Sequence, residues 1–105
     1  MKAGFHFDLF SKRSKDYGLA GQPMDAFFYV YILVSDASDT IHYTGITRNL
    51  QQRLLEHNRG KCPNSSAHRP WRIETAIAFK SERKARTFEK YLKSGSGREF
   101  ARRHF

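Results

Sequence analysis

The sequence predicts a small α+β fold in the order strand, strand, helix, strand, helix, followed by a short helical segment. Three observations carry this prediction. Two short aromatic stretches, 28–34 and 41–46, flank a six-residue segment in which all but Ala37 are polar, a pattern typical of a hairpin. Alternating apolar and polar residues mark a further strand at 71–79. Apolar residues at helical spacing lie between the second and third strands and again after the third.

The length and composition fit one domain with a single modest core. The chain has 105 residues, of which 39% are hydrophobic, and its nine Phe, five Tyr and one Trp provide large side chains to fill a core. No run approaches the ~20 apolar residues of a membrane span, and the N-terminus lacks the apolar segment of a secretory signal. The only cysteine, Cys62, cannot form an intramolecular disulfide. A cytoplasmic protein is therefore expected.

The charge balance indicates a polyanionic partner. Nineteen Lys and Arg residues oppose ten Asp and Glu residues, which gives a net charge of +9. A field of this sign attracts nucleic acids or anionic membrane surfaces. Membrane binding would require a basic amphipathic segment with a spare apolar face, and the sequence offers none that the core does not need. Nucleic acid is the favoured partner, and a merely basic, well-solvated protein is the alternative.

Residues 1–25 differ from the rest of the chain and are predicted to be an N-terminal extension that is flexible or loosely docked. Two glycines and a proline between positions 18 and 23 resemble a linker that leads into the domain at 26–105. The alternative is a basic arm that contacts phosphates, formed by Lys12, Arg13 and Lys15.

The first predicted strand is apolar on both faces and should lie at the centre of the sheet. Residues 28, 30, 32 and 34 share one face, while Tyr29, Tyr31 and Leu33 share the other, so both faces are expected to be covered. The return strand contains Gly45, and a glycine within a strand suggests a bulge or a close approach of another group to the backbone.

The next segment, 50–58, is predicted to be a helix that Thr47 or Asn49 caps and Gly60 ends. Leu50 and Leu54 fall within ~40° of each other on a helical wheel and form its buried side. Arg53 and His57 lie on the adjoining part of the same face. These two side chains are therefore expected to be partly covered.

The last predicted strand begins at Trp71, which is expected in the core, and the second helix opens at Ser81. An apolar stripe at Ala85, Phe88 and Leu92 forms its buried side. Glu89 lies within the same sector, where a carboxylate is unfavourable unless it is paired, hydrogen-bonded or bound to a cation. The sequence Ser94-Gly95-Ser96-Gly97 is expected to end this helix, and residues 98–105 to add a final turn or two.

Four polar residues at semi-buried positions suggest metal-assisted cleavage of a phosphodiester. Glu89 provides oxygen ligands for a hard divalent cation, and the planar guanidinium of Arg53 suits phosphate oxygens. Tyr43 or His57 could accept a proton from the attacking water. The alternative for Glu89 is a purely structural ion pair with Arg53.

The ordered set of motifs resembles the GIY-YIG nuclease superfamily, and most closely its small stand-alone bacterial members. Val30-Tyr31-Ile32 stands at the first signature triplet and Tyr43-Thr44-Gly45 at the second. The resemblance covers about residues 27–103. It also rests on a set of later matches: Thr47, Leu50, Arg53, Leu54, His57-Asn58, Pro70-Trp71, and the run from Phe88 to Arg98 that contains Glu89.

The resemblance implies a three-stranded antiparallel sheet flanked by helices and an active site that uses Mg²⁺ or Mn²⁺. It implies five catalytic residues, of which Glu89 would also be the single metal ligand: Tyr31, Tyr43, Arg53, His57 and Glu89. Two positions depart from the family pattern. Val30 replaces the leading glycine of the first triplet, and Ala101 stands near the place where many relatives have an asparagine.

The leading hypothesis is a divalent-metal-dependent DNA endonuclease that is structure-selective or weakly sequence-specific, with a monomer favoured and DNA repair as the expected setting. Tyr43, helped by His57, would act as the base, and Tyr31 would support the site. Four basic residues are expected to contact the DNA backbone: Lys61, Arg69, Lys93 and Arg98. The alternatives are a catalytically silent nucleic-acid-binding module and a protein-interaction domain.

Two further patterns are open to more than one interpretation. Cys62 with His57 and His68 would supply three zinc ligands at irregular spacing without a fourth, so a zinc site is disfavoured. The segment 94–98 is either a phosphate-binding turn, because small residues let backbone N–H groups approach an anion, or simply the end of a helix.

Overall fold

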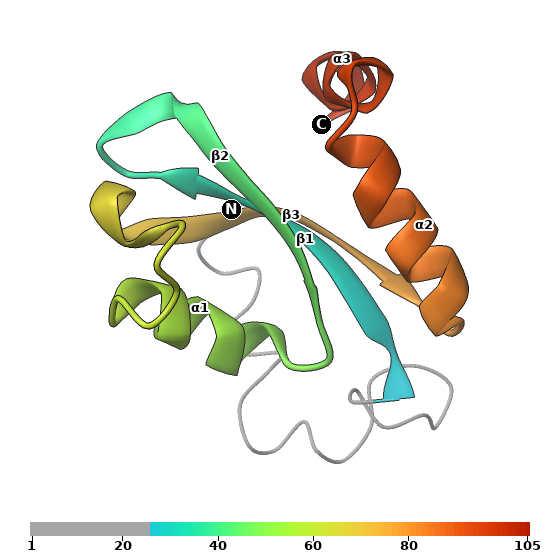
Figure 1. Cartoon of the computed structure of the whole chain (residues 1–105), viewed down its shortest axis with the longest axis horizontal. Coiled ribbons are helices and arrows are strands. Elements are labelled where there is room, and N and C mark those ends of the chain that lie inside the picture. The colour runs from blue at the N-terminus through green and yellow to red at the C-terminus, as the bar shows by residue number, and fades with distance from the viewer. Residues whose placement is uncertain (1–25) are drawn as a thin grey trace.

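The computed structural model describes residues 26–105, so the predicted N-terminal extension lies outside the described residues. In Figure 1 the helix that follows the first hairpin lies on one side of the sheet, and the C-terminal helices lie on the other. The elements in chain order are β1 (Phe28–Ser35), β2 (Ser38–Thr47), α1 (Leu50–Asn58), the 3₁₀ turn η3 (Ser66–His68), β3 (Trp71–Phe79), α2 (Glu82–Leu92) and α3 (Gly95–His104).

The sheet is antiparallel with the order β2-β1-β3, which confirms the predicted fold class. The strand β1 is central because it is apolar on both faces and can be covered from both sides. In the register of the sheet, Tyr31 lies between Gly45 on β2 and Ala76 on β3. This register leaves the tyrosine ring flanked by two of the smallest residues.

The two faces of β1 contribute to two separate cores, as its alternation predicts. Tyr29, Tyr31 and Leu33 pack with Leu50 and Leu54 of α1 and with Trp71 and Ile73 of β3. Val30 and Ile32 pack with residues of the C-terminal helices, namely Ala85, Phe88, Leu92 and Phe100. The sheet therefore separates an α1 layer from an α2–α3 layer (Figure 1).

The α1 layer is tied together where α1 ends and β3 begins. The side-chain amide of Asn58 donates to the Trp71 carbonyl (3.0 Å) and its oxygen accepts from the Trp71 N–H (2.6 Å). This pair of bonds resembles one rung of a β-ladder made by a side chain. It fixes the loop 59–70, which carries η3, between two rigid elements.

The C-terminal end differs from the sequence prediction. The segment Ser94–Gly97 does end α2, but it also starts α3, which is longer than the predicted turn or two. Ser94 accepts a hydrogen bond from the Gly97 N–H and so caps α3 at its N-terminus. Gly97 is required there because a Cβ would overlap the Tyr91 carbonyl oxygen at the end of α2. None of the helices within residues 26–105 is long and apolar enough to span a membrane.

Candidate active site

Two tyrosines from neighbouring strands lie together on the α1 side of the sheet. Tyr31 on β1 crosses over Gly45 on β2, so closely that a Cβ on Gly45 would overlap the tyrosine hydroxyl. Of the two roles predicted for this glycine, the close approach is therefore the one that the structure supports. Tyr43 stacks on the same side, with its ring centroid 6.4 Å from that of Tyr31 and an interplanar angle of 25°.

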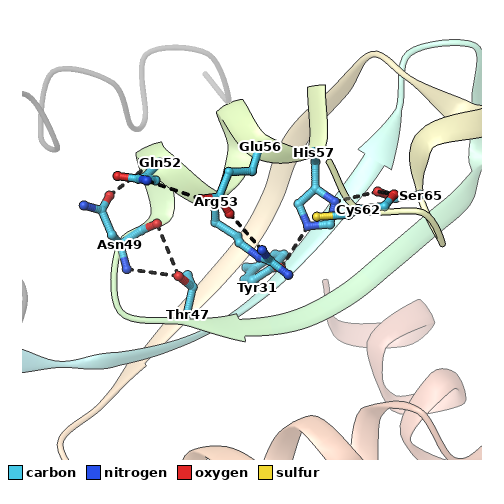
Figure 2. A network of polar contacts seen from close by, with 9 residues as sticks. All are labelled: Tyr31, Thr47, Asn49, Gln52, Arg53, Glu56, His57, Cys62 and Ser65. Carbon is cyan, nitrogen blue, oxygen red and sulfur yellow. Dashed lines mark hydrogen bonds and ion pairs between the residues drawn. The ribbon is translucent and has the colours of Figure 1, made fainter. Parts of the chain in front are cut away.

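The helix α1 brings an arginine and a histidine to this tyrosine pair. Asn49 caps the helix by accepting from the Gln52 N–H, and Thr47 accepts from the N–H of Asn49 (Figure 2). Leu50 and Leu54 anchor the helix on the sheet. Their spacing turns Arg53 and His57, which lie one turn apart, toward the strands.

Figure 2 shows that Arg53, Tyr31 and His57 form one hydrogen-bonded chain. The Nε–H of Arg53 donates to the Tyr31 hydroxyl oxygen at 3.3 Å. The same hydroxyl lies 3.0 Å from Nε2 of His57. Tyr43 contacts His57 through its ring only, edge to face with centroids 4.6 Å apart. The tyrosine that hydrogen-bonds to His57 is therefore Tyr31, whereas the sequence-based hypothesis paired His57 with Tyr43.

The other ring nitrogen of His57 contacts a residue that the sequence analysis missed. Nδ1 of His57 lies 2.6 Å from the Ser65 hydroxyl oxygen, and the Ser65 hydroxyl also donates to the Cys62 carbonyl at 3.3 Å. His57 and Ser65 are both fully buried. Ser65 stands in a run of small polar loop residues, and no sequence feature distinguishes it from Asn64 or Ser66.

Glu56 was also missed, although its spacing from Arg53 is a recognisable signal for an ion pair on a helix. The Nη1 group of Arg53 donates to a Glu56 carboxylate oxygen at 2.8 Å. This bond lowers the pKa of Glu56 and, with a further contribution from Tyr31, raises the pKa of Arg53 above its ordinary value. Arg53 is a permanent cation, and with 36% of its side chain exposed it is accessible to an anion from solvent.

Burial decides the protonation states of Tyr31 and His57. It raises the pKa of Tyr31 to about 12, against the opposing effect of the hydrogen bond from Arg53. It also lowers the pKa of His57, and the positive charge of Arg53 acts in the same direction. At neutral pH the cluster therefore holds a protonated phenol beside a neutral imidazole and a guanidinium cation.

The family profile of the GIY-YIG catalytic domain matches residues 27–102, which is more than half of the chain. The chain belongs to the GIY-YIG family. No curated protein and no solved structure matches it. Membership agrees with the sheet order and helix arrangement, and it supports a nuclease-type function, which in this family generally depends on a divalent metal.

The two departures from the GIY-YIG pattern both fall in the α2–α3 core. Val30 faces away from the tyrosine cluster and packs with Ala85 and Leu92, so a larger residue than glycine fills space between the sheet and α2. Ala101 on α3 packs against the same core. Position 101, near which the resemblance leads us to expect an asparagine, therefore makes an apolar contact instead.

Glu89, the predicted metal ligand of this GIY-YIG domain, comes from α2 on the other side of the sheet. Its side chain is 18% exposed, and one carboxylate oxygen lies 2.9 Å from Nζ of Lys93. Within residues 26–105, Arg53 pairs with Glu56 and not with Glu89. The structure therefore brings together four of the five predicted catalytic residues, and leaves Glu89 in a separate ion pair.

The single carboxylate of Glu89 fits a magnesium-like ion better than a zinc ion. No group of three or more His, Cys, Asp or Glu side chains gathers in the described part of the chain, which argues against a zinc site of protein ligands alone, including the disfavoured Cys62–His57–His68 set. Magnesium, by contrast, is commonly bound by one or two carboxylates together with waters and substrate phosphates. Glu89 suits that mode because its ion pair is with an exposed lysine that can move away.

The four predicted phosphate-binding residues fall into two exposed groups. Lys61 and Arg69 lie on the loop after α1, where Arg69 donates from Nε to the Ser66 carbonyl and its guanidinium packs over Gly60. Lys93 and Arg98 lie where α2 meets α3. One group therefore belongs to the α1 layer and the other to the α2–α3 layer.

Proposed function

We propose that this GIY-YIG protein is a divalent-metal-dependent endonuclease that hydrolyses DNA phosphodiester bonds. The observation that carries the proposal is the hydrogen-bonded chain of Arg53, Tyr31 and His57. It combines a solvent-accessible cation with a buried proton acceptor, which are the two groups that water attack on a phosphodiester requires.

Arg53 is the residue that binds the scissile phosphate. Its Nε–H donates to Tyr31 and its Nη1 donates to Glu56, so the guanidinium plane is held in one orientation while part of it still faces solvent. A guanidinium fixed in this way needs little reorganisation when negative charge develops on the phosphate oxygens. Glu56 therefore acts as a positioning residue for Arg53.

Tyr31 and His57 together accept the proton of the attacking water. As the water oxygen forms its bond to phosphorus and the bond to the leaving oxygen breaks, the water proton passes to the Tyr31 oxygen. The Tyr31 proton passes at the same time to Nε2 of His57. We assign the base function to Tyr31 because its hydroxyl contacts both Arg53 and His57, whereas Tyr43 contacts His57 only through its ring. Tyr43 closes the site by stacking on Tyr31.

Glu89 would hold the metal ion, which when bound supplies positive charge to the phosphate and leaving oxygen. Lys93 pairs with Glu89 and would have to release one carboxylate oxygen. Because Lys93 is about half exposed, that release costs little.

DNA is the proposed substrate because of the net charge of +9 and the two groups of exposed cations. The residues Lys61, Arg69, Lys93 and Arg98 would contact phosphates and so position the duplex without reading bases. We therefore propose structure-selective or weakly sequence-specific cleavage.

The test is a nicking assay on plasmid, linear, branched and single-stranded DNA with Mg²⁺ or Mn²⁺. Arg53→Ala and Glu89→Gln are expected to lose activity by about a hundredfold or more, because each removes charge stabilisation of the transition state. Arg59→Ala, on an exposed position at the end of α1, is the matched control. Unchanged activity in both variants would overturn the assignment. Salt-sensitive DNA binding without turnover would indicate a catalytically silent binding module.

A further inference from the structure

His57 has both ring nitrogens engaged in a fully buried environment. Nε2 lies 3.0 Å from the Tyr31 hydroxyl oxygen and Nδ1 lies 2.6 Å from the Ser65 hydroxyl oxygen. A neutral imidazole carries its single proton on one nitrogen and a lone pair on the other. Which nitrogen holds the proton decides whether His57 can receive one from Tyr31.

The Tyr31 hydroxyl sets the direction of the chain. Arg53 can only donate, so the Tyr31 oxygen is an acceptor in that bond. Tyr31 is 2% exposed, and its hydroxyl has two partners within residues 26–105, Arg53 and His57. The hydroxyl hydrogen therefore has His57 Nε2 as its acceptor. A proton on Nε2 would leave this buried O–H without an acceptor among the described side chains, and folded proteins avoid buried donors without a partner.

The remaining bonds follow in the same direction. With Nε2 as the acceptor, the proton lies on Nδ1 and is donated to the Ser65 oxygen. The Ser65 hydroxyl then donates its own hydrogen to the Cys62 carbonyl at 3.3 Å. Every donor in the chain from Arg53 through Tyr31, His57 and Ser65 to Cys62 thereby has an acceptor (Figure 2).

Ser65 is held in place by its backbone as well as by its side chain. Its N–H donates to the Cys62 carbonyl at 3.0 Å, and its carbonyl accepts from the indole N–H of Trp71 at 2.9 Å. These bonds fasten the loop residue to the start of β3 inside the α1 core. A serine fixed in this way can impose an orientation on the imidazole instead of following it.

We propose that Ser65 is a positioning residue that orients His57 and keeps its proton on Nδ1, so that Nε2 is available to accept the proton of Tyr31. The catalytic consequence rests on the proposed nuclease function, whereas the orientation and the tautomer do not. Ser65 plays the part that a carboxylate plays in many catalytic histidine pairs, but as a neutral acceptor.

The first test is the tautomer of His57 in the unmodified full chain, read from the ¹⁵N chemical shifts and couplings of its imidazole ring. The proposal expects protonated Nδ1 and unprotonated Nε2 at neutral pH. Protonated Nε2 would overturn it. This measurement requires neither a variant nor a DNA substrate, so it decides the proposal even where Ser65→Ala fails to fold or no DNA is cleaved.

The second test compares Ser65→Ala with Ser66→Ala, in which the neighbouring hydroxyl donates to the Pro63 carbonyl and does not contact His57. Ser65→Ala should increase the Nε2-protonated form and lower the single-turnover cleavage rate by roughly tenfold to a hundredfold, with DNA affinity unchanged. Ser66→Ala should match the wild type. An unchanged tautomer and rate in folded Ser65→Ala would overturn the proposal, whereas absence of cleavage by the wild type would count only against the nuclease function.

Discussion

Gly45 makes the tyrosine cluster possible at the scale of single residues. Its missing side chain leaves the space over β2 that the Tyr31 ring occupies, and the hydroxyl at the end of that ring meets both Arg53 and His57. The second signature triplet is therefore a packing requirement as much as a chemical one. Position 45 accepts no larger residue unless Tyr31 moves.

Gly45→Ala is expected to displace the Tyr31 ring and break its hydrogen bond to His57. The added methyl should lower the free energy of unfolding by ~1–3 kcal/mol, as overpacking does in other cores, and should lower cleavage at least tenfold. Urea denaturation and single-turnover cleavage measure the two effects. Wild-type stability together with a wild-type cleavage rate would show that Tyr31 is not confined by this glycine.

The lowered pKa of His57 predicts the pH dependence of both cleavage and stability. The imidazole must be neutral to accept the Tyr31 proton, so kcat/KM should be flat near neutral pH and fall by about tenfold per pH unit below the pKa of His57. Because burial and Arg53 lower this pKa in the folded state, the unfolded chain binds the proton more readily. Neutral, buried His57 therefore makes its full contribution to the free energy of unfolding above pH ~6.5. This contribution is lost as the pH falls below that value and His57 becomes protonated.

A pH–rate profile and urea denaturation between pH 5 and 8 measure these effects. The charged and titratable groups around His57 are Arg53 and Glu56 on its own helix, Tyr31 and Tyr43 on the strands, and Cys62 on the loop. A cleavage rate that rises as the pH falls toward 5.5 would contradict a role of neutral His57 as proton acceptor.

At the scale of elements, the sequence predicted most closely the helices and strands whose apolar residues recur with a regular spacing because one face is buried. The bounds of α1 and β3 agree with the predicted 50–58 and 71–79, because caps and alternation mark both. The strand β2 begins at Ser38, three residues earlier than predicted. Local propensity assigns these polar residues to a turn, but pairing with β1 holds them in the extended conformation of a strand.

The parts that the sequence did not predict depend on contacts between distant segments. The serine–glycine run at 94–97 has the composition of a helix end, and its role as the start of α3 depends on packing against Tyr91. Ser65 contacts His57 only because Asn58 and Trp71 fix the loop between α1 and β3. The tyrosine, arginine and histidine positions were predictable from motif spacing, but their hydrogen-bond pairing was not.

The junction of α2 and α3 provides a prediction with a matched control. Gly97→Ala would place a methyl group on the Tyr91 carbonyl, so α3 must shift, and the free energy of unfolding should fall by ~1–3 kcal/mol. Gly95→Ala meets nothing within 4 Å and should be neutral or stabilising by up to ~1 kcal/mol, because alanine is the better helix former. Urea denaturation measures both variants. Equal stabilities would show that the helices do not pack as closely as described.

At the scale of the whole molecule, the net charge predicts strongly salt-dependent DNA binding. If the four proposed cations each contact a phosphate, log K should fall with log salt with a slope of about −3.6, which corresponds to ~0.9 per contact. Lys61→Ala and Arg98→Ala should each reduce the slope by about 0.9. Arg86→Ala is the control, because its guanidinium pairs with Glu82 on α2. Slopes that are unchanged in Lys61→Ala and Arg98→Ala would remove those residues from the interface.

The central claim is that the Tyr31 hydroxyl, between Arg53 and His57, takes the proton of the attacking water. The most direct test is the single-turnover cleavage rate of Tyr31→Phe, which removes one oxygen and keeps the ring over Gly45. We expect a loss of about a hundredfold or more with unchanged DNA affinity, and wild-type behaviour for Tyr91→Phe on the exposed side of α2. Cleavage by Tyr31→Phe at the wild-type rate would contradict the proposed mechanism.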